Sequence, residues 1–311
     1  NKLVVSIWDG EGENATDNYD IHYDEGTLTV TPKAITVTTE SHEFTYNGTD
    51  QFWEKCYTDG LVSADQSLEV IEHTTIRNVD DKSRENALVV IVTANGKDNV
   101  DGYYLTANYT ISYSNGTLTV IPRPITIKTG DATKVYDGAP LTCNSYKDVA
   151  EDGDRGLVDG HKVTYVAVNG TRTEAGVSDN TVDLEKQPII VDENGKEVTK
   201  NYEVSYAYGK LTVTKRPIKI TTVSATKVYD GTPLDPTLYE SYTVTSTANP
   251  ALSPILAPDQ SAEVDFLNTV TDVGSVKNKV AVRIYADADT EKATDLSANY
   301  EISYEYGTLS I

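Results

Sequence analysis

The chain has 311 residues, of which 38% are hydrophobic, and this length and apolar content predict two or three globular domains with packed cores. Its 48 Asp and Glu residues against 26 Lys and Arg residues give a formal net charge of −22, which would repel DNA and acidic membrane surfaces and argues against nucleic acid as a partner. No apolar run approaches the ~18 residues that a membrane-spanning helix needs, so no membrane insertion of this fragment is expected.

A domain-sized repeat organises the whole chain. Copies of one pattern, written NYTISYSNGTLTV in its second occurrence, begin at Asn18, Asn108, Asn201 and Asn299. The first three copies are followed by KAITVTT, RPITIKT or RPIKITT, and then by a YNG or YDG sequence. Self-similarity at a fixed period is the signature of a repeat architecture. We therefore expect the end of a preceding repeat at 1–32, a divergent repeat 1 at 33–122, repeat 2 at 123–215 and repeat 3 at 216–311.

Residues 1–32 match only the last part of a repeat, and about thirty residues cannot bury a core of their own. We expect this segment to pack on residues 33–122, or to pair at a sheet edge with another copy of the chain. Alternatively, the hairpin expected at 18–31 opens a repeat instead of closing one. Contacts of residues 33–48 with 18–31 or with 108–121 would show which of these two repeat boundaries is correct. The sequence begins at Asn1 without a signal sequence and looks like a piece of a longer protein.

The late part of each repeat alternates apolar and polar residues with a period of two. In NYTISY, Tyr109, Ile111 and Tyr113 alternate with polar residues, and Leu118 and Val120 do so in TLTV. This pattern indicates two strands, each with one buried face. The three residues between the strands predict a hairpin loop that ends in a glycine with positive φ. The predicted loop glycines are Gly26, Gly116, Gly209 and Gly307.

The expected fold class is mainly β, a tandem array of Ig-like β-sandwich modules, because each repeat holds about six to eight short strands with closely spaced turns. A β-grasp-like α+β module with one short helix is the alternative, since 63–73 and 253–262 have room for a turn or two of helix. Proline lacks a backbone donor and fixes φ, which suits a stiff connection between modules. The prolines near the expected junctions are Pro32, Pro122, Pro124 and Pro217.

The YNG or YDG sequence predicts a tight turn in every repeat. Asp or Asn caps its own backbone and Gly tolerates positive φ, while the preceding Tyr can bury its ring and keep its hydroxyl at the edge. Asn47 replaces the Asp in repeat 1, so a charge is dispensable and a structural turn is favoured over an acidic site. The residues of the three turns are Tyr46, Gly48, Tyr136, Asp137, Gly138, Tyr229, Asp230 and Gly231.

The sequence contains no arrangement typical of an enzyme. It has no nucleophile elbow, phosphate-binding glycine loop or HExxH motif, and its histidines lack metal-ligand spacing. We therefore expect no catalytic residue, no metal and no cofactor. Cys56 and Cys143 lie at non-equivalent places in different repeats and are expected to be free thiols. The scattered histidines are His22, His42, His73 and His161.

Calcium binding and a covalent cross-link are weaker alternatives. Acidic clusters supply the oxygen ligands that calcium prefers, but none here matches an EF-hand loop, so solvated loops are favoured. Candidates for a lysine–asparagine cross-link are the lysines Lys134 and Lys227 and the asparagines Asn201 and Asn299. Phe44 stands at the lysine position in repeat 1, so such a bond cannot be general. The acidic clusters lie at 80–81, 151–154 and 287–289.

Aromatic residues outside the repeated motifs are the best candidates for a ligand site. The CH-rich face of a pyranose sugar covers an aromatic ring well. The stretch QFWEKCY occurs in repeat 1 only and contributes Phe52, Trp53 and Tyr57. We expect a carbohydrate site, if there is one, at these three residues, with starch, a host or dietary glycan or a mucin as ligand. The alternative is that Trp53 serves in packing.

The order RPITI, KVYDGT, GLVDG and NYxIxYxxGTLTV resembles the YDG and MBG repeat domains of large bacterial cell-surface proteins. The resemblance covers essentially the whole chain and is strongest for 123–215 and 216–311. It is weaker for 33–122, where RPI becomes KAI and KVYDG becomes FTYNG. It implies extracellular display on a bacterial cell or secretion, neighbouring modules as partners, and no catalytic residues. The expected function is a spacer or stalk of an adhesin-like protein, and the alternative is a glycan- or mucin-binding module.

Overall fold

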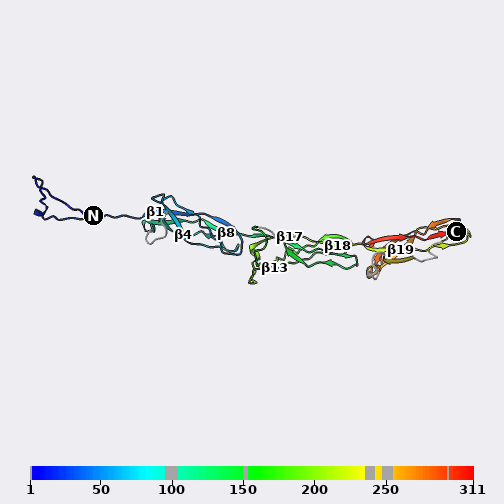
Figure 1. Cartoon of the computed structure of the whole chain (residues 1–311). Coiled ribbons are helices and arrows are strands. Elements are labelled where there is room, and N and C mark those ends of the chain that lie inside the picture. Colours follow the sequence, from blue (N-terminus) through cyan, green and yellow to red (C-terminus); the bar gives the residue numbers. More distant parts are fainter. Residues whose placement is uncertain (1, 95–103, 150–152, 235–241, 247–254, 293) are drawn as a thin grey trace. The chain divides into compact units, whose positions relative to one another are not determined.

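The computed structural model describes residues 2–94, 104–149, 153–234, 242–246, 255–292 and 294–311 (Figure 1). The chain divides into two compact units, unit 1 from Asn1 to Ile121 and unit 2 from Pro122 to Ile311. The described residues of both units are mainly β, as the sequence predicts, and their only helical elements are single 3-10 turns.

Unit 1 contains repeat 1, and its first strands pair with its last strands. Strand β1 is parallel to β7 and antiparallel to β3. Strand β2 is parallel to β8, which also pairs with β5, and β4 and β6 form an antiparallel two-stranded sheet. The elements are η1 (Thr16–Asn18), β1 (Lys33–Thr39), β2 (His42–Thr45), β3 (Cys56–Tyr57), β4 (Gln66–His73), β5 (Arg84–Glu85), β6 (Leu88–Ala94), η2 (Thr106–Asn108), β7 (Tyr109–Ser114) and β8 (Thr117–Ile121).

The core of unit 1 lies between two β layers. Ile35 on β1 and Tyr109 on β7 form a buried cluster with Val92 on β6. Val37 on β1 packs in the same way with Leu88 and Val90 of β6. Sheet β3-β1-β7 therefore packs face to face on the β4-β6 sheet, which is the sandwich arrangement that the period-two alternation predicts.

The segment before repeat 1 differs from the prediction. Its described residues contain no strand, only η1 and an isolated bridge between Trp8 and Asn14. Leu28 and Val30 are 77% and 96% exposed, so they are not packed on residues 33–122. In repeat 1 the equivalent strands β7 and β8 pair with β1 and β2, and no copies of β1 and β2 occur within residues 1–32. The alternation is present in this segment, but its partner strands are not.

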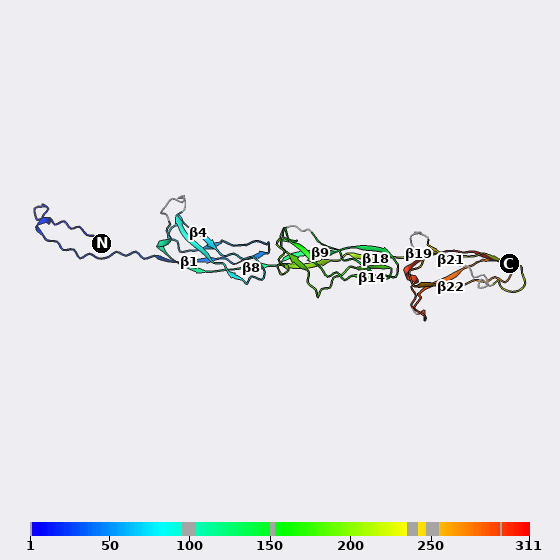
Figure 2. The same ribbon diagram turned by 90° about the horizontal axis from the view of Figure 1, so that it is seen from below.

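Unit 2 contains repeats 2 and 3, which follow the same pairing plan (Figure 2). The first strand of each repeat is parallel to a late strand, as β9 is to β17 and β19 is to β25. The strands of repeat 2 are β9 (Arg123–Thr129), β10 (Ala132–Val135), β11 (Leu141–Thr142), β12 (Tyr146–Asp148), β13 (Lys162–Tyr165), β14 (Thr171–Arg172), β15 (Gly176–Asp179), β16 (Ile189–Val191), β17 (Tyr202–Ala207) and β18 (Lys210–Thr214), with the 3-10 turn η3 (Thr199–Asn201). Those of repeat 3 are β19 (Arg216–Thr222), β20 (Ala225–Thr226), β21 (Tyr242–Ser246), β22 (Gln260–Phe266), β23 (Ser275–Lys277), β24 (Val280–Ala286), β25 (Tyr300–Glu305) and β26 (Thr308–Ser310), with η5 (Ser297–Asn299).

Two predicted details of the fold are wrong. The late strands of a repeat do not form a hairpin, because β7 and β8 belong to different sheets and each pairs with a strand from the start of the repeat. The segment 63–73 is not helical, since β4 occupies 66–73 with Leu68 and Val70 facing the core. The described part of 253–262 also ends in a strand, β22. The short helix that the β-grasp alternative required is therefore not found in these described segments.

The glycines between the late strands serve a purpose other than the predicted one. Gly116, Gly209 and Gly307 are absent from the residues with positive φ. A Cβ atom on Gly209 would instead lie 2.3 Å from the carbonyl oxygen of Gly130, and Gly116 and Gly307 are equally crowded by backbone. Gly26, in the segment without strands, has no other heavy atom within 4 Å of the equivalent position. Glycine is required here because two backbone segments cross at close range.

A buried Thr–Asn pair holds this crossing together. In repeat 2, the Thr129 hydroxyl donates to the Asn180 carbonyl (2.7 Å) and accepts from the Gly209 N–H (2.9 Å). The Asn180 side-chain amide donates to the Gly130 carbonyl (3.0 Å). The same bonds recur in the sets Thr39, Asn86 and Gly116 and Thr222, Asn278 and Gly307. This Thr–Asn pair was not predicted from the sequence, although the two residues recur at equivalent positions in all three repeats.

Replacing Thr129 by Val tests this network. The substitution keeps the shape of the side chain but leaves the buried Asn180 carbonyl and Gly209 N–H without their partner, so we expect repeat 2 to lose about 2 kcal/mol of stability. Thr133→Val, on the exposed face of β10, is the matched control and should change stability by less than about 0.5 kcal/mol. Urea unfolding of both variants measures the difference, and equal midpoints would show that the network does not stabilise the crossing.

Candidate functional site

The YNG and YDG sequences form the same turn in all three repeats. Gly48, Gly138 and Gly231 have φ of 82°, 79° and 79°. In repeat 2 the Asp137 carboxylate accepts from the Ala139 N–H (3.0 Å), and Asn47 and Asp230 make the equivalent bonds to Thr49 and Thr232. Each is therefore an Asx turn, in which the side chain caps its own backbone.

A lysine reinforces the turn in repeats 2 and 3, Lys134 from β10 and Lys227 from the position directly after β20. The Lys134 ammonium contacts the Asp137 carboxylate at 2.5 Å, and Lys227 contacts Asp230 at 2.8 Å. The two lysines considered for a cross-link are thus each engaged by the turn of their own repeat. The hydrogen bond from Lys227, followed by those from the Thr232 N–H and hydroxyl, lowers the pKa of Asp230 to about 2.

The pKa of Asp230 gives a pH prediction with a definite sign. Because the pKa in the folded state lies below the ordinary value of about 3.9, the turn is stabilised above pH 4 and loses this contribution as pH falls from about 4 toward 2. Carboxyl ¹³C NMR titration should give a value near 2 for Asp230, and Lys227→Met should raise it toward the ordinary value. A value near 3.9 in the native chain would contradict the contact.

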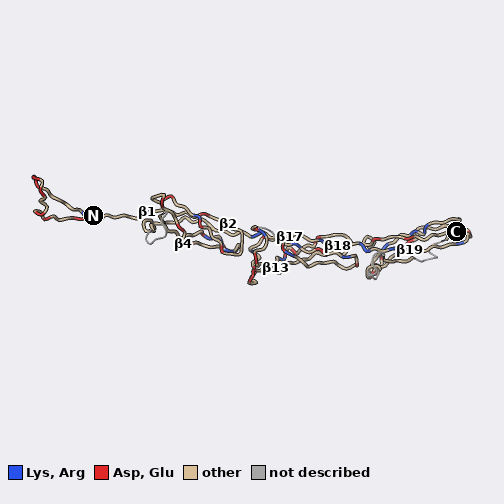
Figure 3. The backbone as a smooth tube through the Cα atoms, in the orientation of Figure 1, with Lys and Arg blue, Asp and Glu red and all other residues tan. Residues whose placement is uncertain are grey.

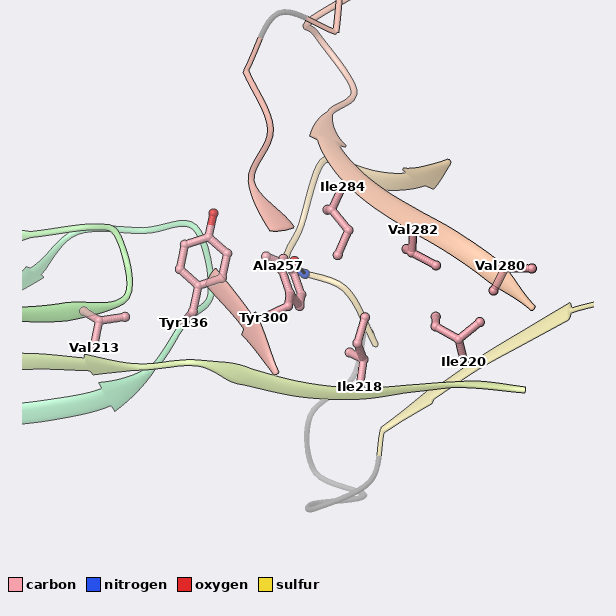
Figure 4. Packing of buried hydrophobic residues seen from close by; sticks show 9 residues of the cluster. All are labelled: Tyr136, Val213, Ile218, Ile220, Ala257, Val280, Val282, Ile284 and Tyr300. Carbon is pink, nitrogen blue, oxygen red and sulfur yellow. Dashed lines mark hydrogen bonds between the residues drawn. The ribbon is translucent and has the colours of Figure 1, made fainter. Parts of the chain in front are cut away.

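The tyrosine of the repeat 2 turn packs into repeat 3. Tyr136 is 1% exposed and belongs to a buried cluster with residues of β19, β24 and β25 (Figure 4). Its ring meets the Tyr300 ring edge-to-face, with 5.6 Å between centroids. Ile218 and Ile284, which lie in the same cluster, are fully buried. The hydrophobic core of repeat 3 therefore includes a side chain from the YDG turn of repeat 2.

Hydrogen bonds fix the position of Tyr136. Its hydroxyl accepts from the Gln260 side-chain amide (2.9 Å), and its carbonyl accepts from Nη1 of the buried Arg216 (3.2 Å). Gln260 in turn accepts from the Tyr300 hydroxyl (2.8 Å). Burial raises the pKa of both Tyr136 and Tyr300, so both phenols stay neutral at physiological pH. We call Tyr136, Arg216, Gln260 and Tyr300 the Tyr136 junction.

A second contact between the repeats lies beside the Tyr136 junction. The Ala175 N–H donates to the Asn299 side-chain carbonyl (2.8 Å), and the Asn299 amide donates to the Glu174 carboxylate. Glu174 and Ala175 precede β15 in repeat 2, while Asn299 is the asparagine of the NY pair in repeat 3. The asparagine of the NY motif in repeat 3 thus binds repeat 2 at this junction.

The repeat 3 side of the junction is one instance of a recurring polar cap. The Tyr300 hydroxyl accepts from the Ala257 N–H (2.9 Å) and contacts Gln260. Tyr109 in repeat 1 and Tyr202 in repeat 2 make the equivalent bonds to loop N–H groups. The side chains that contact these two hydroxyls are Gln66 and His161. Each repeat therefore carries the same kind of cap at the end where its NY strand begins.

From the sequence alone, the YDG motif was predicted to be a local turn, and the Tyr136 junction was not predicted. Tyr136 and Tyr229 have the same neighbours in TKVYDG, yet Tyr136 is buried and Tyr229 is 57% exposed. The difference arises because repeat 3 covers Tyr136, and local sequence does not encode that cover. The sequence does hold one indication of the junction. Every repeat has a Gln or His that contacts its NY tyrosine in the cap, although the two residues are far apart in the chain.

The structure places the predicted ligand residues on the surface of repeat 1. The Trp53 ring stacks on His42 with 3.7 Å between centroids, and Phe52 stacks on His73 at 4.0 Å. The Trp53 N–H donates to the Glu40 carboxylate (3.4 Å). Phe52 is 46% and Tyr57 60% exposed. Trp53 and Phe52 thus each have a packing partner, and Phe52 and Tyr57 keep large exposed areas.

A cavity of about 450 Å³ lies elsewhere, in repeat 2, with Leu184, Pro188, Tyr202 and Tyr206 among its lining residues. It contains none of the three aromatic residues predicted to bind a ligand. Cys56 and Cys143 are free thiols, as predicted. Among the residues that the structure describes, no group of three or more His, Cys, Asp or Glu is placed to hold a metal ion. Glu151 and Asp152 of one acidic cluster lie outside those residues.

No protein family model and no curated protein matches the chain. Among solved structures, the crystal structure of Drosophila N-cadherin EC1-4 aligns with 89% of this chain and 74% of its own, at 12% identity and a TM-score of 0.16. A likeness this weak carries no argument about fold or function. In the described residues, no helix has the length and apolar character needed to cross a membrane.

Proposed function

We propose that the chain is a non-catalytic repeat array that serves as a spacer or stalk in an extracellular, adhesin-like protein of a bacterial cell surface. The observation that carries this proposal is the Tyr136 junction. A spacer must hold its repeats in a defined arrangement, and here the side chain of one repeat completes the core of the next. The partners of each repeat in this function are its neighbours in the same chain.

The junction supports a stiff connection on physical grounds. Lys215 alone separates β18 from β19, so the two repeats are joined by a very short connection. Tyr136 and Asn299 then add contacts between the two repeats, from the YDG turn of one repeat and the NY motif of the other. Two buried anchors with hydrogen bonds limit rotation far more than a short linker alone does, because any rotation exposes an aromatic ring and breaks bonds made by buried groups.

The charge of the chain suits the same function. Acidic residues are distributed along both units (Figure 3), and the formal net charge is −22. A high net charge of one sign keeps proteins soluble and makes copies repel one another. Neighbouring arrays on a crowded surface would therefore stay separate.

Distance measurement between repeats 2 and 3 tests the proposal. Spin labels at Lys162→Cys and Ser275→Cys, with Cys56 and Cys143 replaced by Ser, report the separation by double electron–electron resonance. We expect one narrow distance distribution, a broad one after Tyr136→Ala, and no change after Tyr229→Ala. A broad distribution in the chain with an intact Tyr136 would remove the support for a stiff spacer.

Glycan binding at repeat 1 is the second candidate, because Phe52 and Tyr57 are exposed aromatic residues beside Trp53. If the array is a spacer, Trp53→Ala should leave retention on a glycan array or on starch unchanged. Trp8→Ala, which alters the other, exposed tryptophan, is the control. A loss of retention of tenfold or more in Trp53→Ala but not in Trp8→Ala would establish binding at this site instead.

A further inference from the structure

Repeat 3 ends in an apolar surface that has no cover among the described residues. Val228 is 88%, Tyr229 57% and Val273 79% exposed. Single exposed apolar side chains are common on protein surfaces. Several exposed apolar side chains at one end of a repeat indicate an interaction surface. These three residues occupy the positions that Val135, Tyr136 and Ala175 hold in repeat 2, where Tyr136 is buried by repeat 3.

The equivalence of the two surfaces follows from strand register. Strand β10 is parallel to β18 in repeat 2, and β20 is parallel to β26 in repeat 3. Strand β15 pairs with β18, with Val177 opposite Thr212. Strand β23 pairs with β26 in the same way, with Ser275 opposite Ser310. Ala175 and Val273 therefore lie at the same place, two residues before each of these positions.

The exposed turn is already in the conformation that docks in repeat 2. Gly231 and Gly138 both have φ of 79°. Asp230 accepts from the Thr232 N–H at 3.0 Å, as Asp137 does from the Ala139 N–H. Lys227 supports the turn as Lys134 does. Docking of Tyr229 would thus need no rearrangement of the turn, which reduces the entropy lost on binding.

We infer that Val228, Tyr229 and Val273 form a docking surface for a further repeat of the same kind, connected in tandem. The inference rests on the proposed function, because it extends the junction between repeats 2 and 3 to the end of repeat 3. The occupant presents an arginine at the start of its first strand, a Gln or His in its cap, and an Asn-Tyr pair. Its arginine binds the Tyr229 carbonyl, its cap binds the Tyr229 hydroxyl, and its asparagine binds the Val273 N–H and the Asp272 carboxylate.

The charge and the connection favour this occupant over a separate copy of the chain. Asp272 stands where Glu174 contacts the amide of Asn299, so the acidic partner of the asparagine is retained. A repeat connected in tandem is present near this small surface at an effective concentration in the millimolar range. Free copies of the chain with this net charge repel one another.

The test extends the chain. Residues 214–311 are appended directly after Ile311, which reproduces the Thr-Lys connection between repeats 2 and 3. 3-Fluorotyrosine at position 229 is followed by ¹⁹F NMR, and the paramagnetic relaxation caused by a neutral gadolinium chelate measures its exposure. The same probe at position 136 gives the value for a docked tyrosine. We expect the relaxation at position 229 to fall at least fivefold on extension and to reach the value at position 136.

Control variants make each outcome decisive. Changing the appended copies of Arg216 and Gln260 to Ala should restore the exposed value at position 229. An exposed value in the extended chain, with position 136 still protected, overturns the inference and leaves the proposed function intact. Exposure at position 136 would defeat the proposed function itself. Protection of position 229 that depends on concentration in the 311-residue chain would identify a separate copy as the occupant and overturn the tandem partner.

Discussion

Tyr136→Ala is expected to destabilise unit 2 by about 3–5 kcal/mol, the usual loss when a buried aromatic side chain is truncated in a core. The ring is 1% exposed and packs against Tyr300, and its hydroxyl is bound by Gln260. Scanning calorimetry should show one transition for repeats 2 and 3 in the native chain and two in the variant, because the shared cluster couples their unfolding.

Tyr229→Ala is the matched control for this substitution. The same residue in the same TKVYDG sequence is 57% exposed at the end of repeat 3, so its removal should change stability by less than about 0.5 kcal/mol. Tyr136→Phe separates the ring from the hydroxyl and should lose only about 1 kcal/mol. Equal losses for Tyr136→Ala and Tyr229→Ala would mean that the tyrosine stabilises its own turn rather than the junction.

Gly209→Ala is expected to destabilise repeat 2 by about 3 kcal/mol, at the upper end of the usual range for overpacking. The new methyl group would lie 2.3 Å from the Gly130 carbonyl oxygen and 2.5 Å from that of Thr129. Both are backbone atoms, and the Gly130 carbonyl oxygen accepts from the Asn180 amide, so it cannot move aside without breaking that network. Chemical denaturation measures the loss.

Gly26→Ala is the control, since Gly26 stands at the same place in the repeated sequence and its Cβ would meet no atom within 4 Å. It should leave stability unchanged within about 0.5 kcal/mol. A loss at Gly26 as large as that at Gly209 would show that residues 18–31 are folded like a late pair of strands. No loss at Gly209 would show that the backbone crossing is looser than described.

Alternation along the chain was sufficient to locate recurring strands such as those of TLTV and RPITIKT, because one face of each is buried. Ile125 and Ile127 of β9, for example, are buried as their period-two spacing predicts. Pairing was not predictable in the same way. The register of β9 with β17 joins residues about 80 positions apart, and the local hairpin between β17 and β18 looked equally plausible from their spacing.

Local sequence also says nothing about what covers a side chain. Tyr136 and Tyr229 have the same neighbours and the same turn, yet only Tyr136 has a repeat packed on it. The strand patterns at 18–31 failed for a related reason, since their alternation is intact and their partner strands are missing. The Asn180 network was not predicted, because its Thr and Asn recur only once per repeat and their polar bonds are not part of the period-two apolar pattern.

The most direct test of the account is the measurement of residual dipolar couplings for backbone amides in β9–β18 and β19–β26. A common alignment tensor for both repeats in the native chain, and two different tensors in Tyr136→Ala, is the result the account predicts. Two independent tensors in the native chain would show that repeats 2 and 3 move separately and would contradict the claim that the YDG tyrosine couples neighbouring repeats.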